Sequence, residues 1–229
     1  MSRAALAPAL LIALAPVTAN ALEVRIDPHA DLLYRQALPL LEQAENQDDN
    51  GTLRIAIGVD PELNRQGRAM AQTLPTAVAL LKKSVELGHP VAQYRLALYY
   101  TTYLPAAQIA DAACPLLEAS LNQGFAPPAT VIDSWCAPYN TSPAYREALE
   151  AIPSMATLYA PYYPQPAARL ACSRSHPQGL QMQWGRQRDY QAEVYRLLSE
   201  LDPQHRQALL QKAVDINGCV AAQQRLTRR

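Results

Sequence analysis

The stretch Ala79–Tyr100, with the sequence ALLKKSVELGHPVAQYRLALYY, decides the fold of this chain. Apolar residues recur at helical spacing up to Gly88, and a glycine at this point is typical of the left-handed residue that ends a helix. The dipeptide His89-Pro90 then begins a second helix, because proline is favoured in the first helical turn. The stretch therefore predicts two helices, over 76–87 and 91–104, joined by a tight turn.

The same arrangement returns twice further along the chain. Residues 116–121 are rich in leucine and lead to Gly124 and to a second predicted helix over 129–136. Near the C-terminus, residues 208–215 lead to Gly218 and a helix over 221–226. Self-similarity with a period in the thirties is typical of an α-solenoid, in which each helical hairpin buries one face against its neighbour. We therefore expect an all-α fold, a short α-solenoid of antiparallel helical hairpins.

The stretch Ala79–Tyr100 resembles a Sel1-like repeat, a relative of the tetratricopeptide repeat. The positions that match the pattern are Leu80, Leu81, Gly88, Ala92, Leu96 and Tyr99. The match is weaker over 113–136, and over 208–226 one extra residue precedes the turn. The resemblance implies a TPR-like solenoid that serves as a scaffold or adaptor for another protein. The chain lacks the closely spaced cysteine pairs of the cysteine-rich members, so the β-lactam binding claimed for some of those is not implied.

Helix starts and prolines divide the rest of the chain. An N-capping side chain stands directly before proline at Asp27-Pro28, Asp60-Pro61, Ser142-Pro143 and Asp202-Pro203. Residues 53–59 fit an extended connector or a piece of helix. We expect one domain over 22–229, with N-terminal capping helices at 22–74, two Sel1-like hairpins at 75–136, short or degenerate helices in the proline-rich 137–200, and a C-terminal partial repeat at 201–229.

The first residues have the pattern of an export signal. Arg3 precedes an uncharged apolar run over 4–17, and Ala19-Asn20-Ala21 fits a signal peptidase site. A membrane anchor is the alternative, but the run is short for a span and contains prolines. We expect a signal peptide over 1–21, no stable membrane insertion after cleavage, and a periplasmic or secreted protein.

Four cysteines in an exported chain favour two disulfides. The alternatives are buried thiols or a metal site, although no C-x-x-C pair is present. Sequence alone allows three connectivities. One hypothesis pairs Cys114 with Cys136, because they fall on the two helices of one predicted hairpin, and then Cys172 with Cys219.

The charges and motifs favour binding over chemistry. Lys plus Arg and Asp plus Glu balance at 20 each, which argues against nucleic acid as a partner. No P-loop, Rossmann, serine-hydrolase or zinc-protease motif occurs, so we expect no enzyme, cofactor or metal. Cys172 and His176, four residues apart, are the only pair spaced like a catalytic nucleophile and its base, and a proline directly follows the histidine. A periplasmic enzyme and a small-ligand or peptidoglycan-binding module remain alternatives.

Tyrosines supply the candidate interface. Tyrosine offers an apolar ring and a polar tip, which protein interfaces favour. Tyr99 fits the solenoid core, and Trp135 and Trp184 are also expected in the core. The residues predicted for the interface are Tyr94, Tyr100, Tyr103, Tyr162 and Tyr163. The expected partner is another protein, and a narrower alternative is an immunity protein that neutralises a secreted toxin.

Overall fold

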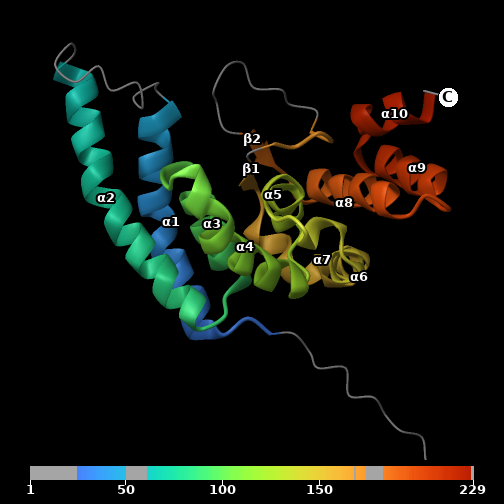
Figure 1. Ribbon diagram of the computed structural model, residues 1–229. Coiled ribbons are helices and arrows are strands. Elements are labelled where there is room, and N and C mark those ends of the chain that lie inside the picture. Colours follow the sequence, from blue (N-terminus) through green and yellow to red (C-terminus); the bar gives the residue numbers. More distant parts are fainter. Residues whose placement is uncertain (1–24, 50–60, 168, 174–182, 228–229) are drawn as a thin grey trace, which may run out of the picture.

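A computed structural model describes residues 25–49, 61–167, 169–173 and 183–227. The predicted signal peptide, the connector over 53–59 and His176 lie outside these residues. Helices make up most of the described chain, so the all-α prediction is confirmed at the level of architecture (Figure 1).

The N-terminal half consists of helices that pack against their neighbours in sequence. These are α1 (Pro28–Asp49), α2 (Pro61–Glu86), α3 (Pro90–Tyr103), α4 (Ala106–Asn122) and α5 (Pro128–Trp135). Asp27 caps α1, because its Oδ1 accepts from the backbone N–H groups of His29 at 2.9 Å and Ala30 at 2.8 Å. One prediction is wrong here: the capping helices do not end at 74, because α2 runs unbroken through Pro75 while packing along α1 (Figure 1).

Two of the turns between helices repeat the same hydrogen bonds. Gly88 and Gly124 have φ of +81° and +85°, the left-handed conformation that glycine adopts without strain. Ser84 and Ser120, at equivalent positions before these glycines, each donate a side-chain hydrogen bond of 2.7 Å to a carbonyl in the first turn of the preceding helix. The carbonyl of each serine also accepts from the residue after the glycine. The internal similarity of the sequence is therefore matched by local geometry.

The proline-rich middle forms short helical pieces. They are η1 (Tyr139–Thr141), α6 (Pro143–Ala151), η2 (Ile152–Met155), α7 (Ala156–Tyr159) and η3 (Ala160–Tyr162). Two strands that the sequence did not predict follow, β1 (Gln165–Ala167) and β2 (Gln183–Gly185), which pair antiparallel with Pro166 opposite Trp184. Each strand has only three residues, too few to show an alternating pattern.

The C-terminal part contains α8 (Gln187–Leu201), α9 (Arg206–Asn217) and α10 (Val220–Thr227). The prediction of degenerate helices up to residue 200 is wrong for α8, a regular helix of 15 residues. No proline occurs between Gln187 and Leu201, so nothing interrupts its hydrogen bonds. Gly218, with φ of +73°, makes the α9–α10 turn as predicted.

Two disulfides are present, which indicates an oxidising compartment. Cys114 on α4 bonds to Cys136 at the end of α5, with Cα atoms 5.6 Å apart. Cys172, in the segment after β1, bonds to Cys219 at the start of α10, with a Cα separation of 4.5 Å. Within the described ranges, no helix has both the length and the apolar character needed to span a membrane.

Candidate functional site

Tyr94 lies in the core, and its prediction as an interface residue is wrong. Its side chain is completely buried, its ring packs edge-on against Phe125 at 5.8 Å, and its hydroxyl donates to the Pro166 carbonyl at 2.5 Å. Burial raises the pKa of this phenol well above its usual value. The tyrosine turns inward because β1, which is remote in sequence, provides a buried carbonyl for its hydroxyl.

Tyr162 and Tyr163 are half-buried and make internal contacts. The Tyr162 hydroxyl donates to Asp31 Oδ1 at 2.8 Å, which joins η3 to α1. The ring of Tyr163 lies 5.8 Å from the rings of both Phe125 and Tyr190. These two side chains stabilise the junction between the middle segment and the helices, so they are not included in the surface described below.

His89 belongs to the same junction. Its Nδ1 accepts from the Ala92 backbone N–H at 3.2 Å and caps α3, so the ring hydrogen is on Nε2, 3.4 Å from Asp31 Oδ1. Burial lowers the pKa of His89, against an opposing effect of Asp31. Burial also opposes ionisation of Asp31, but hydrogen bonds from Arg35, Tyr162 and His89 outweigh it and leave its pKa below the usual value.

Both ring nitrogens of His89 are therefore engaged, and no serine, threonine or cysteine is among their partners. The ring stacks on Tyr34 at 4.9 Å between centroids. The arrangement is suited to holding α1, α3 and η3 together. The sequence suggested an ordinary turn residue here, because Asp31 and Tyr162 meet His89 only in the fold.

Tyr100 and Tyr103 do reach the surface, together with Tyr99. The Tyr99 ring lies 5.7 Å from that of Tyr100 and 4.9 Å from that of Tyr103, between centroids. Tyr103 is 41% exposed, and Tyr99 and Tyr100 are half-buried. The last turn of α3 thus presents a cluster of three aromatic rings.

The chain on both sides of this cluster is uncharged. Residues 96–110, from the middle of α3 into α4, contain no Asp, Glu, Lys, Arg or His. Several are exposed, including Thr102, Pro105, Gln108 and Ala110. We call Tyr99, Tyr100, Tyr103 and residues 104–108 and 110 the tyrosine surface. A charge-poor, aromatic-rich surface is the composition that distinguishes the centre of protein interfaces.

The two tryptophans were predicted in the core, and this is wrong. Trp135 is 42% exposed at the end of α5, and Trp184 is 37% exposed on β2, where the Arg95 guanidinium lies 5.7 Å from its ring centroid. Trp135 is the last residue of its helix and Trp184 stands on a three-residue strand, so neither position is enclosed. Among the described residues, no group of three or more His, Cys, Asp and Glu side chains is arranged to hold a metal.

Comparisons with known proteins give no relative on which to base a function. A comparison of the chain with family models found no match. Comparisons with curated proteins and with solved structures also found none.

Proposed function

We propose that this chain is an exported helical-repeat protein of the Sel1-like type that binds another protein as a scaffold or adaptor. Its place of action would be the periplasm or the medium outside the cell. The observation that carries the proposal is the tyrosine surface at the α3–α4 turn.

The composition of this surface favours a protein partner. The absence of charge over 96–110 leaves no group to neutralise phosphates or another polyanion. Tyrosine rings with exposed area bury well against a partner, and their hydroxyls find hydrogen bonds at the rim. Tyr99 holds the other two rings in place through its contacts with both, so less conformational entropy is lost on binding.

The rest of the chain supports the repeat and export parts of the proposal. The matched turns at Gly88 and Gly124, with their matched serine hydrogen bonds, are what successive copies of one hairpin unit would have. The two disulfides fit a signal-bearing chain that folds outside the cytoplasm.

Site-specific photo-crosslinking in cells tests the proposal. A benzophenone amino acid at position 103 should capture a defined protein. The same group at Val220, which is 48% exposed on α10, serves as the matched control and should not capture it. Equal labelling from both positions, or no specific product from any of positions 100, 103 and 108, would contradict the proposal.

The identity of the captured protein separates the narrower roles. An immunity protein would be crosslinked to a secreted toxin and should abolish the activity of that toxin. A scaffold would be crosslinked to components of a larger assembly.

A further inference from the structure

A cavity of about 340 Å³ lies between α5, α8, α10 and the segment after β1. Its volume falls within the range of small-molecule sites in proteins. Unlike most such sites it is lined by charges, three arginines and three carboxylates. It is formed by other helices than those of the tyrosine surface, and the proposed function does not use it.

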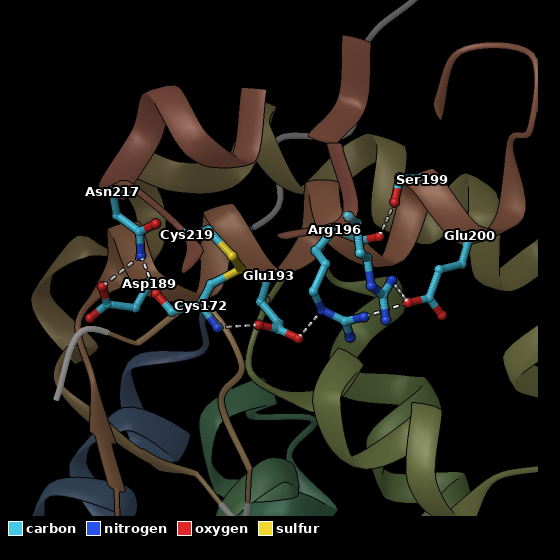
Figure 2. The surroundings of a disulfide bond; sticks show 9 residues. Cys172, Asp189, Glu193, Arg196, Ser199, Glu200, Asn217 and Cys219 are labelled. Carbon is cyan, nitrogen blue, oxygen red and sulfur yellow. Dashed lines mark hydrogen bonds and ion pairs between the residues drawn. A yellow bond between two sulfur atoms is a disulfide. The ribbon is translucent and has the colours of Figure 1, made fainter. Parts of the chain in front are cut away.

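One side of the cavity is a fixed ionic network. Glu193 and Arg196 are buried on α8, and Arg196 Nε donates to Glu193 Oε1 at 2.5 Å. Arg196 also pairs with Glu200, which receives a second arginine, Arg225 of α10. Figure 2 shows Glu193 and Arg196 in line between the Cys172–Cys219 disulfide and Glu200.

The disulfide holds this network in position. Glu193 Oε2 accepts from the backbone N–H of Cys172 at 2.8 Å, and the Cys172 carbonyl accepts from Asn217 Nδ2 at 2.6 Å (Figure 2). Glu193 thus has a hydrogen-bond partner on each carboxylate oxygen. Groups fixed in this way form a preorganised wall that need not rearrange when a ligand enters.

Two further charged side chains of the cavity are exposed and make no close ion pair with the described residues. Arg169 makes no hydrogen bond or ion pair with any residue that the structure describes, and its side chain is exposed. Asp133 on α5 approaches Arg196 Nη2 only to 4.0 Å and is 42% exposed. The two side chains interact electrostatically, and the amide of Gln224 also lines the space. The cavity therefore offers one cation without a direct partner among the described residues and one anion held only by a long ion pair to Arg196.

We infer that this cavity binds a small zwitterion of the α-amino-acid type, a free amino acid or a short peptide. Arg169 receives the ligand carboxylate, because a guanidinium matches a carboxylate with two parallel hydrogen bonds. Asp133 receives the ammonium group. A ligand that brings both signs of charge can pair with both groups, whereas a simple anion or cation pairs with only one of them.

Calorimetric titration of the disulfide-bonded mature chain tests this assignment. The probes are L-alanine and L-alanyl-L-alanine, each with two blocked forms, the N-acetyl form and the C-terminal amide. We expect at least one unblocked probe to bind. Each of its blocked forms should bind at least about tenfold more weakly. Arg169→Gln and Asp133→Asn should each weaken the unblocked probe by a similar factor, and each should remove the discrimination against one blocked form.

Arg188→Gln is the control, because Arg188 is an exposed arginine of α8 that does not line the cavity. It should leave binding unchanged. Both test positions are exposed, so the variants should retain the helical circular dichroism of the native chain. No heat of binding for either unblocked probe at millimolar concentration, or binding that Arg169→Gln and Asp133→Asn leave unchanged, would overturn the inference.

Discussion

Substituting alanine for Gly88 and for Gly124, which lie at equivalent turns, separates the cost of backbone strain from the cost of a steric clash. Both glycines have nearly the same positive φ, +81° and +85°. A methyl group at Gly88 would meet no heavy atom within 4 Å, whereas one at Gly124 would lie 2.5 Å from Met155 Cγ and 2.8 Å from Met155 Cβ. The first substitution therefore probes backbone conformation alone, and the second adds a steric clash.

The expected losses follow from these distances. An L-residue in the left-handed region costs about 1 kcal/mol relative to glycine, so Gly88→Ala should lower the free energy of unfolding by about that amount. Overpacking of a filled site costs about 1–3 kcal/mol more, so Gly124→Ala should lower it by about 2–4 kcal/mol.

Urea unfolding followed by circular dichroism measures both losses, and Met155→Ala identifies the source of the difference. In the Met155→Ala background, the penalty of Gly124→Ala should fall by about 1 kcal/mol, because the nearest clashing atom is gone. The penalty of Gly88→Ala should not change in that background. Equal losses at the two glycines, or no coupling between positions 124 and 155, would refute the described geometry of the α4–α5 turn.

Two other predictions concern the disulfides and the pH dependence of stability. The variant Cys172→Ser/Cys219→Ser opens a loop of 47 residues and should lose about 4 kcal/mol, and Cys114→Ser/Cys136→Ser opens one of 22 and should lose about 3 kcal/mol. Urea titration in the absence of reductant measures both, and a larger loss for the shorter loop would contradict the loop-entropy reasoning. Because burial lowers the pKa of His89, the unfolded chain takes up a proton first as the pH falls below 6.5, and stability falls with it. His89→Asn keeps a capping oxygen but cannot titrate, so its unfolding free energy should decline less between pH 7.5 and 5.5 than that of the native chain, and an unchanged slope would exclude His89 as the cause.

The parts of the fold that local signals specify could be predicted from the sequence. Gly88 and Gly124 end their helices where the sequence placed the ends, since a glycine after an apolar helical run has few other uses. Ser142 caps α6 by accepting from the Tyr145 backbone N–H, as its position before proline indicated. The pairing of Cys114 with Cys136 followed from the hairpin that contains them.

The parts that depend on contacts between distant segments could not be predicted. Tyr94 was assigned to the interface because tyrosine has an apolar ring and a polar tip, and only the β1 carbonyl at Pro166 explains why it is inside. Prolines as far as Pro177 led to the prediction of degenerate helices up to residue 200, so the regular helix α8 was missed. The tyrosine surface could have been predicted from the sequence, because residues 96–110 form an uncharged stretch that contains three tyrosines.

The cavity gave no sequence signal. Arg169, Arg196 and Arg225 belong to three separate segments, and each in isolation resembles an ordinary solvated charge. Only the packing of α8 against the disulfide-bonded segment brings them to one space.

The dissociation constant of the partner captured through position 103 tests the central claim most directly. Tyr100→Ser/Tyr103→Ser removes two of the three clustered rings and should weaken binding at least about 30-fold, the equivalent of about 2 kcal/mol for a typical interface hot spot. Val220→Ser, which removes an exposed apolar side chain from α10, should change the constant by less than about twofold. Equal affinity of the native chain and the double tyrosine variant would show that the chain does not bind through the tyrosine surface.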